Sequence, residues 1–264
     1  MPYFSIITVS FNAADFIERT VRSALSQTFT DFEILIQDGA STDGTLDAIP
    51  QDERICVVSE RDGGIYDGMN RAIRRSRGKY CIFMNCGDVF ASDDVLQTVW
   101  NATHTLTEDS VVYGNYSIDG VLHAQPNHIT DFYLYRTPLC HQSMFIAGGL
   151  FKTIGLYDCR YKILADFNFT VKAFRAGIPF LHVPLAVCRY QGGGVSESKK
   201  GIVLKNSERQ EILKREYSRL QRVKYELILF FSLRRLRIWL FSGHAPRWLT
   251  VMYRKLVNFI NRNS

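Results

Sequence analysis

Two strand-like segments of this sequence end in carboxylates, a residue type that binds metal ions and nucleotides. The apolar run 80–84 leads into the polar segment 85–88, which ends at Asp88, and the run 32–37 leads into Asp38. In an open α/β sheet, the carboxyl ends of parallel strands meet at one edge, where ligands bind. The two segments therefore predict a ligand-binding cleft at that edge, of the kind that holds a nucleotide.

Each of these carboxylates also has a structural alternative. Asp88 comes shortly before the Ser-Asp-Asp segment 92–94 and the helix-like run 95–99, so it could belong to the cap of that helix. Asp38 is followed by Gly39, and Asp-Gly pairs are common in turns. Both alternatives stay open on the sequence alone.

An alternating pattern of strand-like and helix-like segments positions these residues. The expected strands are 4–10, 32–37, 55–59 and 80–85, and the expected helices are 16–25, 43–49 and 66–77. This alternation predicts an α/β fold with a Rossmann-like, mainly parallel sheet flanked by helices. No G-x-G-x-x-G motif follows the first strand, which argues against a dinucleotide-binding site.

Length and composition indicate a folded protein with a large core. The chain has 264 residues, of which 46% are hydrophobic, enough for one large domain with or without a C-terminal appendage. Its six cysteines contain no C-x-x-C pair, which argues against a zinc cluster and favours a reducing cytoplasm. The apolar run 5–10 is too short for a signal or spanning segment and is expected to be a buried strand.

Positive charge is concentrated in the last quarter of the chain. Residues 199–264 contain 16 Lys and Arg and 4 Asp and Glu, whereas residues 1–198 contain 16 and 22. We expect the chain to be helical from about residue 202, and its segment 225–241 combines Leu, Phe and Trp with arginines. Those arginines argue against a spanning helix and favour one lying in a membrane interface. The alternative is that the apolar residues pack on the domain and the arginines are solvated.

Seven short motifs have an order and spacing that resemble a known family. They are 5–12 (SIITVSFN), 37–45 (QDGASTDGT), 59–70 (SERDGGIYDGMN), 84–88 (MNCGD), 141–143 (HQS), 164–167 (LADF) and 192–196 (GGGVS). Over about residues 3–196 the chain resembles the family 2 glycosyltransferases of GT-A fold, in particular bacterial enzymes of exopolysaccharide and O-antigen synthesis such as the colanic acid type. The resemblance implies a catalytic domain at 1–198, with a nucleotide-sugar-binding half at about 1–115 and an acceptor half at about 116–198, followed by a basic helical region at 199–264.

The resemblance also implies a donor site at the sheet edge. Asp38 would accept a hydrogen bond from a base nitrogen of the nucleotide, which uracil or guanine can donate. The other residues expected on the donor and acceptor sides are Thr8, Ser10, Phe11, Asn12, Asp62, Asn70, Arg71, Asn85, Cys86, Gly87, His141 and Gln142. Of these, Arg71 could instead be a solvated helix residue, and His141 could be a core histidine.

The resemblance implies a divalent cation at Asp88. This residue matches the last carboxylate of the family's D-x-D-type motif, which holds Mn²⁺ or Mg²⁺ against the donor diphosphate. Asn85 and Gly87 stand where many family members have aspartates. We therefore expect the diphosphate to supply much of the metal coordination.

Asp166 matches the family's catalytic base. A carboxylate in a partly dry cleft can take the proton of an attacking hydroxyl, while the metal stabilises the departing diphosphate. The resemblance thus implies a single displacement with inversion. Asp166 could also be a carboxylate that only stabilises a helix N-terminus. Tyr66 is expected to pack rather than to act in catalysis, and Gly192–Gly194 to form a loop that closes over the diphosphate.

The expected function is an inverting transfer of a sugar from a UDP-sugar, in preference to a GDP-sugar, to a hydroxyl group. The expected acceptor is a polyprenyl-diphosphate-linked or other glycan of surface polysaccharide synthesis, reached at the inner face of the cytoplasmic membrane. One alternative is a module that binds a nucleotide-sugar or a membrane and has impaired catalysis. Another is a nucleotidyltransferase, although the sequence lacks the phosphate-binding loop expected of that class. Nucleic-acid binding is suggested only by the basic tail.

Overall fold

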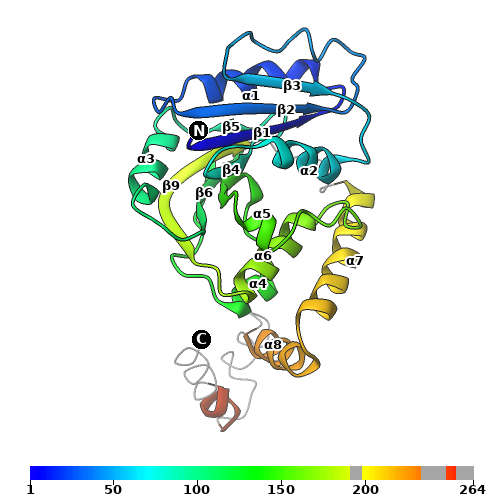
Figure 1. Ribbon diagram of the computed structural model, residues 1–264. Coiled ribbons are helices and arrows are strands. Elements are labelled where there is room, and N and C mark those ends of the chain that lie inside the picture. The colour runs from blue at the N-terminus through cyan, green and yellow to red at the C-terminus, as the bar shows by residue number, and fades with distance from the viewer. Residues whose placement is uncertain (191–197, 233–247, 254–264) are drawn as a thin grey trace. The chain divides into compact units, whose positions relative to one another are not determined.

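The computed structural model describes residues 1–190, 198–232 and 248–253 (Figure 1). Its largest element is a nine-stranded mixed sheet with the order β3-β2-β1-β4-β8-β6-β9-β5, in which β7 pairs with β6. The strands are β1 (Phe4–Ser10), β2 (Phe32–Asp38), β3 (Ile55–Ser59), β4 (Tyr80–Phe83), β5 (Val89–Phe90), β6 (Val111–Ile118), β7 (Val121–His123), β8 (Met144–Ala147) and β9 (Phe180–Tyr190).

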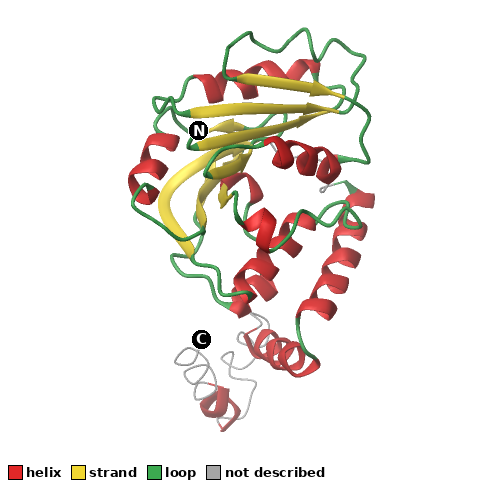
Figure 2. Cartoon of the chain, viewed as in Figure 1, coloured by secondary structure: helices red, strands yellow, loops and turns green. Residues whose placement is uncertain are grey.

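The described part of the chain also contains helices (Figure 2). They are α1 (Ala14–Leu25), α2 (Ile65–Arg75), α3 (Val95–Thr103), α4 (Asp131–Arg136), the 3₁₀ helix η1 (His141–Ser143), α5 (Leu150–Thr153), α6 (Ala165–Arg175), α7 (Lys199–Glu216) and α8 (Arg219–Ser232). Helix α2 contacts β1 and β2, α1 contacts β5, and α3 contacts β9. The predicted α/β fold class is therefore confirmed.

The first half of the sheet is parallel. Strands β2 and β4 pair with β1, and β3 pairs with β2, all in parallel. Every residue of β1 and β2 is buried, including the polar ones, as expected where both faces of a parallel sheet are covered. The register places Ser10 beside Asp38 and Asp38 beside Ser59, so the strand ends meet at one edge as predicted.

The second half of the sheet brings distant segments to the same region. Strand β8 runs antiparallel to both β4 and β6, while β9 pairs in parallel with β6 through a register shift. The short helix η1 precedes β8 and contacts β4, β6 and β9. It therefore lies close to the segment 85–88 that follows β4.

Local sequence accounts for helix α1 and for the return of the chain to the sheet after α2. Helix α1 buries Ile17, Thr20, Val21 and Ala24, whose spacing places them on one face of an α-helix. The chain turns back into the sheet after α2 through Gly78. A Cβ atom at Gly78 would lie 2.5 Å from the backbone nitrogen of Ser5, so only glycine allows this close approach.

The predicted helix at 43–49 is wrong, because this segment forms turns. The Asp43 carboxylate accepts hydrogen bonds from the backbone nitrogens of Thr45 and Ala14, and the Thr45 hydroxyl accepts one from Ala13. Side chains that bind nearby backbone groups in this way compete with helix formation. Pro50 also prevents the backbone from continuing as a helix.

The chain divides into two compact units. The first contains residues 1–129 and 138–208, and the second contains residues 130–137 and 209–264. In the second unit, α4 packs on α8 through aromatic contacts, with ring centroids 5.0 Å apart for Tyr135 and Tyr225. The Tyr225 hydroxyl also donates to the Asp131 carboxylate over 2.8 Å. The assignment of 1–198 and 199–264 as separate domains stays a prediction.

Several predictions for the basic region concern its helices. Within the described residues the chain is helical in α7, in α8 and at 248–253. In that same part of the chain, no helix has both the length and the apolar character needed to cross a bilayer. The predicted loop Gly192–Gly194 and the arginines at 234, 235 and 237 lie outside the described residues.

Candidate active site

Asp38 is enclosed at the end of β2 by hydroxyl and amide donors. Its Oδ1 accepts hydrogen bonds from the hydroxyls of Ser10 and Ser41, and its Oδ2 accepts from the Ser59 hydroxyl and the Ser41 backbone nitrogen, all within 2.8 Å. Burial raises the pKa of this carboxyl, but the hydrogen bonds from Ser41, Ser59 and Ser10 outweigh it and leave the pKa below its ordinary value. Asp38 is thus a buried carboxylate that holds three loops together.

These four hydrogen bonds bear on the predicted base contact. A carboxylate offers about four lone-pair positions, and the protein fills that number at Asp38. A nucleotide N–H would have to displace one of the protein donors. The geometry therefore favours a positioning role for Asp38 and leaves base recognition to a neighbouring group.

Asp62 and Phe11 provide such a neighbouring pair beside Gly39. A Cβ atom at Gly39 would lie 3.2 Å from the Phe11 ring and 3.3 Å from Asp62 Oδ2. Phe11 is 66% exposed, and the Gly64 backbone nitrogen donates to Oδ1 of Asp62 over 2.9 Å. An exposed ring can stack on a flat nucleotide base, and a carboxylate oxygen beside it can accept a hydrogen bond from an N–H group of that base.

The segment after β4 supplies oxygen atoms for a cation. Asp88 is nearly buried, and burial raises its pKa to about 6 even though Gln142 donates a hydrogen bond to it and Arg19 is nearby. The side-chain oxygen of Asn85 is buried and has no hydrogen-bond partner within the described part of the chain. Carboxylate and amide oxygens are the donors that Mn²⁺ and Mg²⁺ accept, so these two residues fit a divalent cation.

The protein alone offers few ligands to such a cation. Among the described residues, no group of three or more His, Cys, Asp or Glu side chains is placed to hold a metal. Burial raises the pKa of Cys86 to about 12, so its thiol remains protonated. A cation at Asp88 would therefore take most of its ligands from phosphate oxygens or water.

The turn at Gly87 keeps this segment in place. Gly87 has a φ angle of +100°, a conformation that glycine adopts without strain. Its nitrogen donates to the Thr20 hydroxyl over 2.9 Å, and its carbonyl accepts from the Arg19 guanidinium over 2.6 Å. Helix α1 thus fixes the backbone between Asn85 and Asp88.

Asp166 lies half-buried in the first turn of α6. Its Oδ1 accepts a hydrogen bond of 2.6 Å from the hydroxyl of Tyr66, which also lies 2.7 Å from the Ile163 carbonyl oxygen. The contact between Tyr66 and Asp166 was not predicted, since Tyr66 was expected only to pack. No sequence signal links two residues 100 positions apart.

His141 and Gln142 lie near Asp166 and Asp88, respectively. Gln142 donates a hydrogen bond to Asp88 Oδ2 over 3.3 Å. A ring nitrogen of His141 lies 3.0 Å from the Tyr157 hydroxyl, and the charge of Asp166 acts on both His141 and Tyr157. Burial lowers the pKa of His141 below its ordinary value, so it is neutral at pH 7. Its stacking on Phe83, at 4.8 Å between centroids, identifies it as a core histidine.

Asn70 and Arg71 have protein partners. Asn70 is buried, and its amide donates to the Tyr157 carbonyl over 2.8 Å and accepts from the Tyr157 nitrogen over 2.9 Å. Asn70 therefore joins α2 to the loop before α6. Arg71 is paired with Glu60 over 2.8 Å and Asp67 over 2.9 Å, and its side chain is 30% exposed.

Three further predicted site residues shape the edge of the sheet. The Thr8 hydroxyl is buried and donates to the Met84 carbonyl over 2.8 Å, which ties β1 to β4. Ser10 donates to Asp38, as described above. Asn12 has a φ angle of +47°, and its side chain accepts from the Thr42 nitrogen over 3.0 Å.

Glu208 of α7 holds the loop that leads to Asp166. This buried carboxylate accepts hydrogen bonds from the backbone nitrogens of Lys162 (2.6 Å), Ile163 (3.0 Å) and Leu164 (2.9 Å). Sequence analysis missed this residue because it lies 42 positions from Asp166 in a helix with many other charged residues. A carboxylate there satisfies the backbone N–H groups of two loop residues and of Leu164, the N-cap of α6.

Replacing Glu208 by glutamine is expected to destabilise the protein. A glutamine keeps one acceptor oxygen but replaces the other with an amide, so at least one buried N–H loses its partner at a cost of about 1–3 kcal/mol. The free energy of unfolding, measured in urea, tests this. Glu108→Gln changes an exposed glutamate and is the control; equal stability of the two variants would contradict the role of Glu208.

Comparison with known proteins supports the sequence resemblance. The model of the family "Glycosyl transferase family 2" matches residues 5–158. A PGL/p-HBAD biosynthesis glycosyltransferase of Mycobacterium bovis is 32% identical over 207 residues, which cover 73% of this chain and 78% of that protein.

Solved structures share the fold at lower sequence identity. Staphylococcus aureus TarS 1–349 in complex with UDP-GlcNAc has a TM-score of 0.64 and 18% identity, over 90% of this chain and 75% of that chain. The mannosyltransferase PcManGT from Pyrobaculum calidifontis, in complex with GDP-Man and Mn²⁺, has a TM-score of 0.61 and 19% identity, over 84% and 64%. With its family match and its GT-A-like sheet, the chain belongs to the family 2 glycosyltransferases.

Proposed function

We propose that the protein transfers a sugar from a nucleoside-diphosphate sugar to a hydroxyl of a glycan acceptor, with inversion at the anomeric carbon. The observation that carries the proposal is that η1 lies near two sites, since Gln142 donates to Asp88 and the charge of Asp166 acts on His141. One site contains the half-buried carboxylate Asp166, and the other contains the oxygens of Asn85 and Asp88. Family membership supports the reaction class.

In the proposed reaction, Asp166 accepts the proton of the attacking hydroxyl. The acceptor oxygen forms a bond to the anomeric carbon as the bond from that carbon to the diphosphate oxygen breaks, and the electron pair leaves with the nucleoside diphosphate. A single displacement from the opposite face inverts the configuration. The half-buried position of Asp166 suits a general base, since water is partly excluded while the hydroxyl can still reach it.

Asp88 and Asn85 are the residues that would hold Mn²⁺ or Mg²⁺. A bound cation would supply electrostatic stabilisation of the negative charge that develops on the leaving diphosphate. The protein holds Asp88 in place through Gln142 and fixes the backbone of the segment through Arg19 and Thr20. Solved GT-A relatives support a metal here, because PcManGT was crystallised with GDP-Man and Mn²⁺.

The donor is proposed to be a UDP-sugar, with a GDP-sugar as the alternative to be tested. Phe11 would stack on the nucleotide base, and Asp62, which also lies beside Gly39, would accept a hydrogen bond from an N–H group of that base. TarS in complex with UDP-GlcNAc and PcManGT in complex with GDP-Man show that this fold accepts either base. Release of nucleoside diphosphate from a panel of UDP- and GDP-sugars, with Mn²⁺ or EDTA, tests both the reaction and the donor class.

Asp62→Asn and Asp38→Asn are expected to have different effects. Asp62→Asn should weaken UDP binding about tenfold, the value of one hydrogen bond to a charged group, without lowering stability. Asp38→Asn should instead lower the free energy of unfolding by about 1–3 kcal/mol, because an amide cannot accept all four hydrogen bonds. Calorimetric titration with UDP and urea unfolding measure the two effects; the reverse pattern would return base recognition to Asp38.

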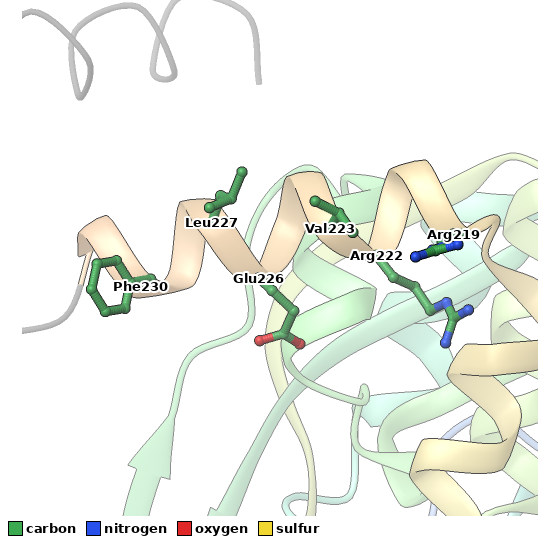
Figure 3. A pocket seen from close by; sticks show the side chains of 6 residues that line it. All are labelled: Arg219, Arg222, Val223, Glu226, Leu227 and Phe230. Carbon is green, nitrogen blue, oxygen red and sulfur yellow. The ribbon is translucent and has the colours of Figure 1, made fainter.

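The acceptor is proposed to be a lipid-linked glycan of surface polysaccharide synthesis, presented at an anionic membrane surface. Helix α8 supports this proposal: Val223 and Leu227 lie on one side of it and Arg222 and Glu226 on another (Figure 3). Leu220 is 83% exposed and Leu227 is 53% exposed. Exposed apolar residues among arginines suit the interface of an anionic bilayer.

Vesicle binding is expected to depend on α8. Wild-type protein should co-sediment with vesicles of phosphatidylglycerol and phosphatidylcholine. Leu227→Glu should weaken this binding at least about tenfold, because a charge would enter the membrane interface. Val121→Glu, which changes an exposed residue of β7, is the matched control. Equal binding of both variants would contradict membrane attachment through α8. Truncation before residue 208 is unsuitable, since it removes Glu208.

A further inference from the structure

The hydroxyl of Tyr66 lies between two acceptors. Tyr66 is the second residue of α2, and its ring is 7% exposed and packs edge-on against Tyr157 at 5.5 Å between centroids. Its oxygen is 2.6 Å from Asp166 Oδ1 and 2.7 Å from the Ile163 carbonyl oxygen. Both distances are those of short O–H···O hydrogen bonds.

A phenol has only one proton to donate. A carbonyl oxygen and an ionised carboxylate are both acceptors, so Tyr66 can donate to only one of them at a time. When Asp166 is protonated, a second arrangement becomes available, in which the carboxylic acid donates to the Tyr66 oxygen and Tyr66 donates to Ile163. All three groups are then satisfied.

We propose that Tyr66 is a positioning residue whose hydroxyl turns from Asp166 to the Ile163 carbonyl as the base takes up the acceptor proton. This inference rests on the proposed role of Asp166 as the general base. The proton from the acceptor hydroxyl ends on Asp166, and the proton of Tyr66 stays on its own oxygen throughout. Only the direction of the phenol O–H bond changes.

The surroundings of Tyr66 support this role. Burial and the nearby Asp166 charge raise its pKa well above the ordinary value, so the phenol keeps its proton near neutral pH. The backbone of Ile163 is held by Glu208, which fixes the second acceptor in place. Among the described residues, the charge of Asp166 also acts on Tyr157 and His141, and burial favours the neutral form of both.

The two states of Asp166 depend on Tyr66 to different extents. A hydrogen bond to an ionised carboxylate is stronger than one between neutral groups. Tyr66 therefore stabilises the ionised base more than the protonated acid. Without the phenol hydroxyl, the acidic limb of the rate profile should move to higher pH.

The test compares Tyr66→Phe with Tyr80→Phe. Tyr80 is also a buried tyrosine; it begins β4, and its hydroxyl lies 2.9 Å from the Ser110 hydroxyl. The pH profile of kcat/KM for nucleoside diphosphate release is measured for both variants, together with the Kd for UDP. We expect the acidic limb to rise by about one pH unit in Tyr66→Phe, with an unchanged Kd, and to stay in place in Tyr80→Phe.

The outcomes separate this inference from the proposed function. A wild-type protein that releases no nucleoside diphosphate, or an Asp166→Asn variant as active as wild type, would overturn the proposed function. If Asp166 is required but the Tyr66→Phe profile keeps its acidic limb, the inference alone is wrong. A rate that falls equally at every pH would show that Tyr66 acts only through packing.

Discussion

Asp166→Asn is expected to lower kcat for sugar transfer about 10²–10⁴-fold, the range by which a positioned general base accelerates a reaction. Asparagine has the same shape as aspartate but cannot take up a proton from the attacking hydroxyl. Because Asp166 lies in α6 and the proposed donor residues Phe11 and Asp62 follow β1 and β3, donor binding should be preserved. Initial rates and the Kd for the nucleotide are the measurements.

The control for this variant is Asp119→Asn. Asp119 is exposed in the turn between β6 and β7, where its φ angle of +48° is one that asparagine also tolerates. Loss of rate in both variants would point to a general effect on folding. A fully active Asp166→Asn would leave Asp166 as a carboxylate that only stabilises the start of α6.

Asp88→Asn is expected to remove metal-dependent turnover, with kcat/KM reduced about 10³-fold, since a cation on a leaving phosphate contributes several kcal/mol. The substitution leaves an oxygen ligand but removes the negative charge. Isothermal titration of UDP in the presence of Mn²⁺ should show weaker binding than in wild type. Asp15→Asn, an exposed position of α1, is the control.

Metal binding at Asp88 should also depend on pH. Burial raises the pKa of Asp88 to about 6 in the metal-free protein, so below that pH a cation must displace a proton. The apparent affinity for Mn²⁺ should then fall about tenfold for each pH unit below 6. Affinity that stays constant between pH 5 and 7, or metal-dependent activity that survives in Asp88→Asn, would place the cation elsewhere.

The parallel half of the fold could be predicted because its strands carry their own signal. The strands 4–10 and 80–83 are wholly buried, and Asn12 and Asn85 follow within two residues of the strand ends. Residues 43–49 were predicted wrongly because the side chains of Asp43 and Thr45 bind backbone groups at the start of α1. Local periodicity cannot reveal such a contact.

The sequence singled out candidate site residues, but their contacts could not be predicted from it. Asp38 stood out at a strand end, but the sequence could not show that Ser41 and Ser59 would occupy its lone pairs. Tyr66 and Glu208 reach the region of Asp166 from other parts of the chain. These contacts depend on long-range packing, which a single sequence does not specify residue by residue.

Transfer of radiolabelled sugar from UDP- and GDP-sugars into a lipid extract tests the central claim most directly. The measurement uses wild-type protein and Asp166→Asn, each with Mn²⁺ or with EDTA, and follows label in the organic phase and nucleoside diphosphate in the aqueous phase. We predict that one class of donor labels a lipid product in equal amount to the nucleoside diphosphate released, only with metal and only with wild type. Release of pyrophosphate in place of nucleoside diphosphate, or donor binding without any labelled product, would contradict it.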